Sequence, residues 1–349
     1  MPAVEESPVR MARGLERGVT RRLSVVAPCF NETNGLAELH RRVTDACRGA
    51  VGEDYELVLV NDGSRDDSWK KMALLAMRDP HVVAINLTRN YGHQIALTAG
   101  LDHCCGERIL IIDADLQDPP ELLPQMLKLM DEGADVVYGQ RRSRKGETQF
   151  KKTLTSVYYR VLRRLVDIDI PLDTGDFRLI TRRVLTVLKS MPEQTRFIRG
   201  MVSWMGLKQV ALVYDRDPRF AGETGYPLKK LIALALDGIT GFSIVPLRIA
   251  SYFGLLTGAL GTAMLLYTIG GWLFAKAPVG WASTTTIILI MGSVQLLVLG
   301  IVGEYLGRLY LESKRRPLYL VDRILAQAAA LEPLEAGRSD DELHGRVTR

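Results

Sequence analysis

Ile-Leu-Ile-Ile-Asp-Ala-Asp-Leu-Gln-Asp-Pro-Pro, residues 109–120, is the stretch of sequence that decides the fold of this chain. It begins as the apolar run of a buried strand and becomes acidic at Asp113 and Asp115, where a strand leaves the core. These two carboxylates stand two residues apart, so their side chains project in the same direction. Ligands of open α/β sheets bind at this carboxyl edge. The stretch therefore predicts a divalent-cation site at the end of a parallel strand.

Short apolar runs bounded by turn residues recur on both sides of this stretch and alternate with helical patterns. The expected strands cover residues 23–27, 56–60, 82–87, 109–112 and 135–138, and the expected helices cover residues 36–48, 68–77, 93–101 and 120–132. This alternation predicts a doubly wound α/β domain with a mostly parallel sheet. No Gly-x-Gly-x-x-Gly motif follows the first strand, which argues against a dinucleotide-binding oxidoreductase.

Acidic residues follow three of the expected strands. Glu32 comes after the first strand and Asp62 after the second, so both are expected at the same edge as Asp113 and Asp115. Taken alone, Asp62 is more often an Asx turn or a helix cap than a ligand. The combination changes this weighting, because Asp115, supported by Asp113 and the Gln117 carbonyl, offers the hard oxygen ligands that suit Mg²⁺ or Mn²⁺. Such ions usually also bind substrate phosphates, so a nucleoside diphosphate fits this site.

Two runs near the C-terminal end, residues 251–275 and 277–302, contain no Asp, Glu, Lys or Arg. Each is long enough to cross a hydrocarbon core of about 30 Å as a helix. We predict two transmembrane helices, at about residues 251–275 and 279–303. Basic residues flank the pair on both sides, so the positive-inside rule places both flanks in the cytoplasm. The alternative is a pair of buried helices in a soluble domain, which rarely lack every charge.

The excess of basic charge lies close to these runs. Lys and Arg number 45 and Asp and Glu 40, a net charge of +5. Anionic lipid headgroups attract such flanking charge, so the expected partner is a lipid bilayer and not nucleic acid. Residues 228–248 mix apolar residues with Lys and Asp, which predicts an amphipathic helix in the membrane interface or, alternatively, a helix packed on the sheet. The four cysteines show no paired spacing and are expected to be reduced structural thiols.

These patterns divide the chain into five parts. The N-terminal part is a disordered basic arm that lacks the apolar region of a signal peptide. The expected parts are the arm at residues 1–22, the catalytic domain at 23–227, interfacial helices at 228–250, the transmembrane hairpin at 251–310 and a cytoplasmic tail at 311–349. This organisation predicts a multi-pass protein of the cytoplasmic membrane, with both termini on the cytoplasmic side.

Six motifs of the chain, in order and spacing, resemble those of family 2 glycosyltransferases of the GT-A fold. Within that family they are similar to the polyprenyl-phosphate glycosyltransferases, which include dolichyl-phosphate mannose synthases. The motifs are VAPCFNE at residues 26–32, NDGS at 61–64, RNYGH at 89–93, DADLQDPPE at 113–121, GDFRL at 175–179 and RFAGET at 219–224. The resemblance covers residues 22–320. It implies a GT-A catalytic domain with an α-helical transmembrane hairpin.

The resemblance also implies the reaction and the residues that carry it. The reaction is a metal-dependent, inverting transfer of a hexose from a nucleotide-sugar to a polyprenyl phosphate, undecaprenyl or dolichyl phosphate. The implied nucleotide-sugar residues are Pro28, Glu32, Asp62 and Asp113, and the implied ligands of Mg²⁺ or Mn²⁺ are Asp115 and Gln117, supported by Asp113. Arg141 follows the fifth expected strand and is expected to bind phosphate oxygens of the nucleotide-sugar, the alternative being a solvated surface arginine. Asp62 would accept a hydrogen bond from an N–H of the base. Both uracil and guanine offer that N–H, so the sugar donor can be either a UDP-sugar or GDP-mannose.

The remaining implied residues concern catalysis and the acceptor. Arg219 is expected to clamp phosphate oxygens as a catalytic residue beside Asp115. Many relatives have Lys after the Gly-Glu-Ser/Thr triplet, where this chain has Gly225, so we expect Lys229, or alternatively Lys230, to bind the lipid phosphate instead. Asp176 is either a base or an organiser. A lipid monophosphate is already largely ionised at neutral pH and needs little deprotonation.

Two rival functions share parts of this sequence pattern. A processive polysaccharide synthase normally carries a Gln-x-x-Arg-Trp segment, which residues 199–204 do not supply. A membrane-tethered nucleotide-sugar binding protein without catalysis would need no metal ligands. Small residues in the predicted helices, such as Gly261 and Gly292, allow close helix approach within the hairpin or between protomers. Both a monomer and a homo-oligomer are therefore compatible with the sequence.

Overall fold

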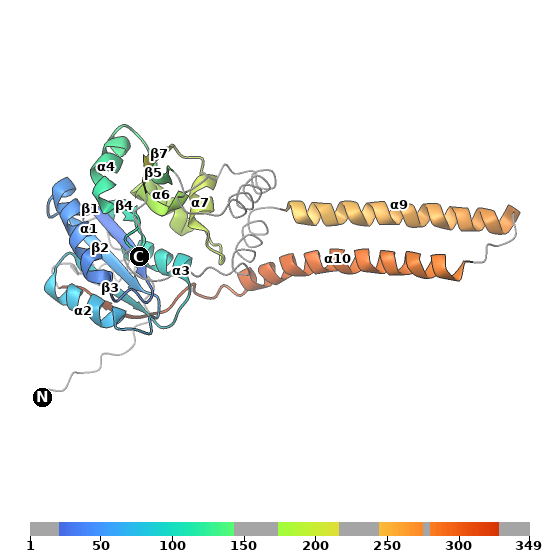
Figure 1. Ribbon diagram of the computed structural model, residues 1–349, viewed down its shortest axis with the longest axis horizontal. Coiled ribbons are helices and arrows are strands. Elements are labelled where there is room, and N and C mark those ends of the chain that lie inside the picture. Colours follow the sequence, from blue (N-terminus) through green and yellow to red (C-terminus); the bar gives the residue numbers. More distant parts are fainter. Residues whose placement is uncertain (1–20, 143–173, 216–243, 275–279, 328–349) are drawn as a thin grey trace, which may run out of the picture.

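The computed structural model describes residues 21–142, 174–215, 244–274 and 280–327. They form a mixed eight-stranded sheet with helices on both faces, and a pair of long helices extends away from it (Figure 1). The strands are β1 (Arg21–Cys29), β2 (Tyr55–Asn61), β3 (Val82–Leu87), β4 (Gly106–Ile111), β5 (Val136–Arg141), β6 (Thr174–Thr181), β7 (Gln209–Tyr214) and β8 (Val321–Leu325), in the order β7-β5-β6-β4-β1-β2-β3-β8. The helices are α1 (Leu36–Val51), α2 (Ser68–Arg78), α3 (His93–His103), the 3₁₀ helix η1 (Pro120–Leu122), α4 (Leu123–Asp131), α6 (Arg182–Ser190), α7 (Ile198–Trp204), α9 (Val245–Phe274) and α10 (Trp281–Ser313).

The centre of the sheet is parallel, as the sequence predicts. β1 pairs in parallel with β2 and β4, and β2 pairs in parallel with β3. All five predicted strands and all four predicted helices occur, although the last helix divides into η1 and α4. β1 begins at Arg21, so the last two residues of the predicted arm belong to the sheet.

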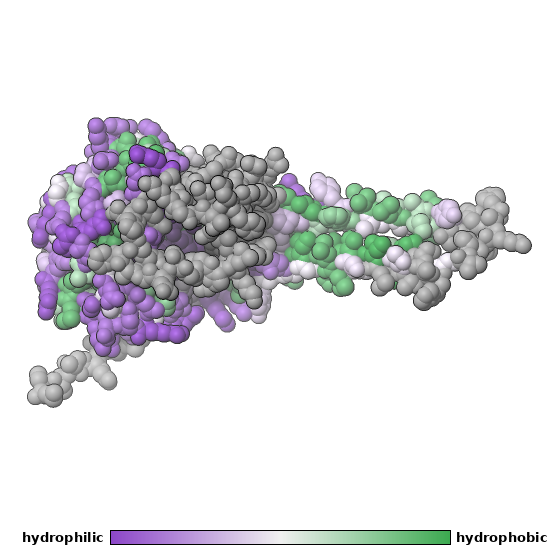
Figure 2. Space-filling view, in the orientation of Figure 1, coloured by the Kyte–Doolittle hydropathy of each residue, from purple (hydrophilic) through white to green (hydrophobic). Residues whose placement is uncertain are grey.

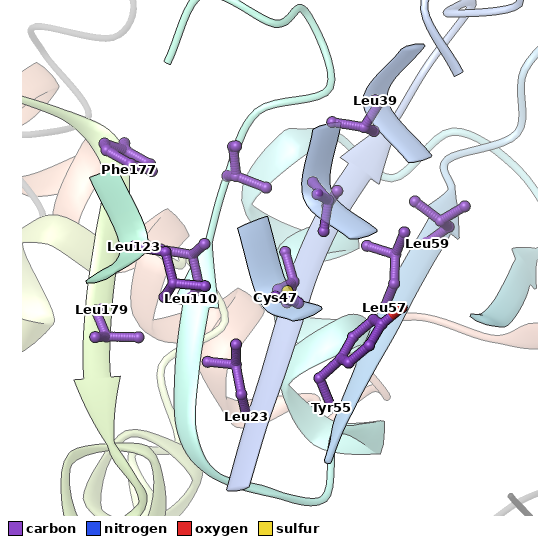
Figure 3. Packing of buried hydrophobic residues seen from close by; sticks show 14 of the residues in the cluster. Leu23, Leu39, Cys47, Tyr55, Leu57, Leu59, Leu110, Leu123, Phe177 and Leu179 are labelled. Carbon is purple, nitrogen blue, oxygen red and sulfur yellow. The ribbon is translucent and has the colours of Figure 1, made fainter. Parts of the chain in front are cut away.

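The core lies on both faces of the sheet because strand side chains alternate with a period of two. Val25 of β1 packs in a cluster with α1, α2 and α4, whereas Val26 packs in a second cluster with α3, α6 and α7. Figure 3 shows part of the first cluster, in which Cys47 of α1 and Leu57 and Leu110 of the sheet take part. Burial of each leucine side chain contributes about 1.5–3 kcal/mol. This two-sided core holds the sheet and its carboxyl edge in place.

Two strands interrupt the parallel order and were not expected from the sequence. β6 lies between β4 and β5 and is antiparallel to both. β8 lies at the edge beside β3, again antiparallel. Because β6 runs in the opposite direction, it begins at the edge where β4 and β5 end, with Thr174 opposite Gln140. The start of β6 thus joins the ligand edge of the sheet.

α9 and α10 run side by side as a hairpin (Figure 1). Within them, Val245–Tyr267 and Thr286–Ser313 are long and apolar enough to cross a membrane. Their apolar side chains face outward, with Leu255 74% and Leu296 70% exposed, and the described surface of the pair is largely apolar (Figure 2). Helices in the core of a soluble domain bury such side chains. The two predicted helices are therefore present, and the alternative of buried core helices is wrong.

The glycines of the hairpin differ in their surroundings. A Cβ at Gly261 would lie 3.3 Å from the Cε atom of Met291, so the two helices approach closely there. Built in the same way at Gly254, Gly258, Gly292, Gly300 or Gly303, a Cβ meets no described atom within 4 Å. Close approach within the hairpin is thus confirmed at Gly261.

The chain returns from α10 to the sheet through residues 314–327, which we call the strap. The hydroxyl group of Tyr319 donates to Asp102 of α3 at 2.8 Å, and β8 then pairs with β3. Asn86 of β3 donates to Asp322 of the strap at 2.9 Å and accepts from Asn61 at 2.7 Å. These residues lie in the predicted tail. That prediction did not include a return to the sheet.

Several predictions fall on residues that the structure does not describe. These are the arm at residues 1–20, most of the interfacial segment 228–250, and the residues Arg219, Gly225 and Lys229. The four cysteines are described. All four are free and buried, in agreement with structural thiols.

Candidate active site

The loops that follow the central strands meet at one edge of the sheet. The loop after β1 is tied to the loop after β2 by side-chain caps, since the Asn31 amide donates to Ser64 at 3.0 Å and the Glu32 amide donates to Ser68 at 2.9 Å. Pro28 precedes this loop and is buried. The structure therefore brings Pro28, Glu32 and the Asp62 loop together, as the sequence predicts.

Asp62 is almost fully buried and holds the loop that follows β3. One carboxylate oxygen accepts from the Tyr91 amide at 2.7 Å, and the other accepts from the Gly92 amide at 3.0 Å. Burial raises the pKa of Asp62, and the two amide hydrogen bonds oppose this rise. Asp62 therefore acts as a cap for the backbone amides of the next loop, which is close to the alternative role of an Asx turn or helix cap. Its contact with a nucleotide base stays a prediction.

Gly63 allows the loops after β2 and β3 to touch. Its φ is +64°, and a Cβ there would lie 2.4 Å from the Asn90 nitrogen. A side chain at this position would be strained and would also separate the two loops. The close approach explains why the turn after Asp62 has a glycine.

The stretch after β4 makes a tight acidic loop. Leu116 has a φ of 58° but is only 2% exposed, so a buried leucine holds a backbone conformation that is rare for its type. This turn lets the Gln117 amide donate back to Asp115 at 3.2 Å. Strained backbone of this kind concentrates at functional sites. Asp113, Asp115 and Gln117 therefore share one loop held by Leu116.

Asp113 lies in the most acidic part of this edge. Burial raises the pKa of its carboxyl to about 6, the positive charge of His93 opposes the rise, and the nearby carboxylates Asp176, Asp118 and Asp115 add to it. The Oδ1 atom of Asp113 is buried and accepts no hydrogen bond from a described residue. Buried carboxylate oxygens without donors suit a hard cation, so the residues present fit Mg²⁺ or Mn²⁺.

His93 is a site residue that the sequence analysis did not single out. Its Nε2 atom lies 3.4 Å from Asp113 Oδ1 and 3.2 Å from Asp176 Oδ2. Ligand atoms of these three residues all lie within 4.8 Å of one another, so they form a second possible metal-binding group that shares Asp113 with the predicted one. The only sequence signal was the position of His93 at the first turn of α3, in the RNYGH motif.

Asp176 reaches this edge through the antiparallel strand β6. Gln94 donates to its Oδ2 atom at 2.8 Å, and the Arg199 Nε atom lies 3.2 Å from its Oδ1 atom. Burial favours the neutral carboxyl, but the hydrogen bond from His93 and the charge of Arg199 prevail and hold the pKa of Asp176 well below its usual range. Asp176 is therefore an ionised carboxylate between His93 and Arg199, with a hydrogen bond from Gln94 to Oδ2 and none from a described residue to Oδ1.

The same contacts act on His93. Burial lowers its pKa, but the hydrogen bond to Asp176 and the charge of Asp113 outweigh this and raise the pKa of His93 to about 9. His93 is still 43% exposed. A cationic, accessible imidazole thus lies between two carboxylates at the sheet edge.

Arg141 lies at the end of β5 and is not a solvated surface arginine. It is 14% exposed, with its Nη2 atom 3.6 Å from buried Asp118 and its Nε donating to the Tyr214 hydroxyl at 3.4 Å. The Tyr214 hydroxyl also donates to Asp118. A Cβ at Gly175 would lie 2.6 Å from the Arg141 Nη2 atom, so the start of β6 closes over this side chain. The arginine is held rigidly beside the acidic loop.

Comparison with known proteins identifies the family. The pattern of Glycosyl transferase family 2 matches residues 24–188, and that of the GtrB C-terminal hairpin matches residues 245–309. The uncharacterized glycosyltransferase YkcC of Bacillus subtilis (strain 168) is 47% identical over 301 residues, which are 86% of this chain and 93% of the relative.

Two further proteins are similar over much of the chain. The prophage bactoprenol glucosyl transferase homolog of Escherichia coli (strain K12) is 38% identical over 307 residues, 87% of this chain and 99% of the relative. The crystal structure of S. aureus TarS 1-349 in complex with UDP-GlcNAc matches with a TM-score of 0.45 and 15% identity, over 63% of this chain and 65% of that chain. The expected GT-A fold and enzyme class are confirmed. The chain belongs to glycosyltransferase family 2 and is a glycosyltransferase with a C-terminal helical hairpin.

Proposed function

We propose that this enzyme transfers a hexose from a nucleotide-sugar to a polyprenyl phosphate at the cytoplasmic face of the membrane. The observation that carries the proposal is Asp113, whose buried Oδ1 atom accepts no hydrogen bond from the described residues. This oxygen lies at the ligand edge of the sheet, and the same chain has two helices long and apolar enough to cross a membrane. The name of the Escherichia coli relative supports glucose as the sugar and bactoprenol as the lipid.

Asp113, Asp115 and Gln117 would hold the divalent cation. Bound there, Mg²⁺ or Mn²⁺ supplies Lewis-acid charge for a departing nucleoside diphosphate. Pro28, Glu32 and Asp62 line the nucleotide in this proposal. Their loops are tied to one another by the hydrogen bonds from the Asn31 and Glu32 amides, so this side of the site is formed in advance.

The reaction in this proposal is a single displacement with inversion at the anomeric carbon. The acceptor phosphate is already ionised at neutral pH and attacks that carbon without a strong base. Arg141, Arg219 and Lys229 would bind phosphate oxygens, and the rigid setting of Arg141 beside Asp118 supports its part. Positioning and neutralisation of charge then provide most of the catalysis.

The proposed arrangement in the membrane follows from charge and length. α9 and α10 cross the bilayer, both chain termini lie in the cytoplasm, and residues 228–250 lie in the interface. The acceptor phosphate stays at headgroup depth while its hydrocarbon tail remains in the bilayer. An active domain next to the hairpin suits such an acceptor.

A donor and acceptor panel tests this function. Purified protein is incubated with labelled UDP-glucose, UDP-galactose, UDP-GlcNAc or GDP-mannose and undecaprenyl phosphate, and label extracted into organic solvent is counted. We expect one donor to give a labelled lipid with Mn²⁺ or Mg²⁺ and none with EDTA. Turnover in EDTA would contradict the metal requirement, and a labelled polymer would indicate a processive synthase. Donor binding without any turnover would indicate a binding protein.

Asp115→Asn is the matching variant for the metal site. It keeps the shape of the side chain but removes a negatively charged oxygen ligand, so we expect turnover to be lost and Mn²⁺ binding in calorimetry to weaken by at least about tenfold. Asp131→Asn is the control, since Asp131 is 64% exposed and pairs with Arg108 away from the site. Full activity of the Asp115 variant would remove that residue from the proposed ligands.

A further inference from the structure

Asp176 is buried between two basic side chains, a setting that does not suit a general base. Its Oδ2 atom accepts from Gln94 at 2.8 Å and lies 3.2 Å from His93, and its Oδ1 atom lies 3.2 Å from Arg199. A base needs an oxygen directed at the proton that it removes. Here Oδ2 is taken up by Gln94 and His93, Oδ1 is buried against the Arg199 guanidinium although it accepts no hydrogen bond from a described residue, and only 9% of the side chain is exposed.

Gln94 makes this arrangement rigid. Its amide nitrogen donates to Asp176, and its amide oxygen accepts from the Ile198 backbone nitrogen at 3.0 Å. One side chain thereby joins the start of α3, the start of β6 and the start of α7. The carboxylate of Asp176 is fixed relative to both His93 on α3 and Arg199 on α7.

His93 and Arg199 are the accessible members of this group. The side chain of His93 is 43% exposed and that of Arg199 is 23% exposed, whereas Arg178 is buried. Arg199 also donates through Nη1 to the Thr174 carbonyl at 2.9 Å. A guanidinium carries five N–H donors. The hydrogen bond to Thr174 uses one of them, and the Nε group, although it lies 3.2 Å from Asp176 Oδ1, makes no hydrogen bond to a described residue. Donors of Arg199 therefore remain for a ligand.

The position of His93 and Arg199 beside the loop of Asp113 and Asp115 indicates what these two side chains can bind. His93 lies 3.4 Å from Asp113, so the pair is next to the loop that is proposed to hold the nucleoside diphosphate. A second anionic group brought to that place needs donors of its own, because two phosphates repel each other. Arginine and imidazole N–H groups are suitable donors for phosphate oxygens.

We propose that Asp176 is a positioning residue, which holds His93 and Arg199 as the donors that bind the phosphate of the acceptor. This inference rests on the proposed transfer to a lipid phosphate. It assigns the acceptor site to the sheet edge where α3, β6 and α7 begin. Asp176 itself takes no proton in the reaction.

Binding and turnover of farnesyl phosphate test the inference. For Arg199→Ala we expect the KM for farnesyl phosphate to rise about tenfold or more, the effect of one lost charge-assisted hydrogen bond, with the Kd for UDP and Mn²⁺ unchanged. Added guanidinium should restore part of the lost activity. Arg183→Ala, which removes a 71% exposed arginine of α6, is the control and should leave both constants unchanged. An unchanged KM in Arg199→Ala overturns the inference.

Asp176→Asn separates positioning from base catalysis. We expect a raised KM for farnesyl phosphate, with kcat at saturating acceptor reduced less than about tenfold. Loss of a general base would instead lower kcat by about 10²–10⁴-fold at an unchanged KM, and that result overturns the proposed role. His93→Asn should raise KM in the same way as Arg199→Ala. Thermal unfolding of each variant shows whether it is folded.

Direct binding keeps this test separate from the test of the transferase function. Calorimetry measures the Kd of farnesyl phosphate and of inorganic phosphate for the wild type and for Arg199→Ala, without turnover. If the wild type binds farnesyl phosphate through Arg199 but transfers no sugar, the proposed function fails and the binding site stands. If turnover occurs and the Kd does not depend on Arg199, the site is wrong and the function stands. Equal affinity for both ligands would indicate a site for free phosphate and overturn its assignment to the lipid acceptor.

Discussion

At the scale of single residues, Asp113 is a carboxyl group whose ionised form is disfavoured by burial. Burial raises the pKa of its carboxyl from 3.8 to about 6, with a contribution from neighbouring carboxylates. A carboxyl group whose pKa is higher in the folded state than in the unfolded state destabilises the fold above the unfolded pKa. The cost grows between about pH 4 and pH 6 and is complete above that range. The protein therefore keeps this ionised side chain at the expense of stability.

Asp113→Asn should stabilise the metal-free protein and inactivate it. The pKa difference corresponds to about 3 kcal/mol at most, so we expect a higher Tm in EDTA at about pH 8 and no gain near pH 4, where the carboxyl is protonated in both states. Thermal unfolding in detergent at the two pH values measures this. Asp67→Asn, a change on the exposed surface of the domain, should leave Tm unchanged at both. A lower Tm of the Asp113 variant at about pH 8 would contradict the argument.

At the scale of elements, the edge depends on loops that touch one another. The turn after β2 fits against the turn after β3 only because position 63 has no side chain, and Asp62 then binds the Tyr91 and Gly92 amides. The loops after β1 and β2 are tied in the same way by Ser64 and Ser68. The predicted nucleotide residues thus depend on contacts between neighbouring loops.

Gly63→Ala should damage both the fold and the nucleotide site. The φ of +64° costs a side chain about 1–2 kcal/mol, and the Cβ would lie 2.4 Å from the Asn90 nitrogen, so the loops must separate. We expect a lower Tm and weaker UDP binding in calorimetry. Gly206→Ala is a matched control, because Gly206 also has a φ of +64° but a Cβ there meets nothing within 4 Å. Equal losses in the two variants would mean that loop contact is unimportant.

The sequence predicted the elements that follow local patterns and missed those that depend on distant pairing. The apolar runs of β1 to β5 and the ends at Asp62 and Asp113 are local signals, and all of them hold. β6 is defined by its antiparallel pairing with β4 and β5, which no period along the chain reveals. For the same reason Asp176 could be named but not placed beside His93. Arg199 was passed over because its partner Asp176 is distant in the sequence.

At the scale of the whole molecule, the described part of the chain combines a sheet domain with an apolar helical hairpin. The surface of the domain is mostly hydrophilic, whereas that of the hairpin is mostly apolar (Figure 2). The Gln194 amide donates to Glu312 near the end of α10 at 2.8 Å, and the strap continues from there to β8. The hairpin is therefore bound to the domain by specific contacts at the C-terminal end of α10.

Cysteine labelling tests the proposed arrangement in the membrane. The native thiols are buried, and burial raises the pKa of Cys29, Cys47 and Cys104, so they should not react. In right-side-out vesicles, an impermeant maleimide should label Lys276→Cys, which lies between the predicted spans. It should label Arg316→Cys, beyond α10, only after permeabilisation. The opposite pattern would reverse the proposed topology.

The strap has a consequence for the order in which the molecule is made. β8 closes the sheet beside β3, and its contact between Asn86 and Asp322 joins residues 236 positions apart. A ribosome therefore completes both helices of the hairpin before the last strand of the sheet exists. Until then the outer side of β3 is an open edge, able to pair with other chains. Translation must therefore pass the end of the hairpin before the catalytic sheet can be completed.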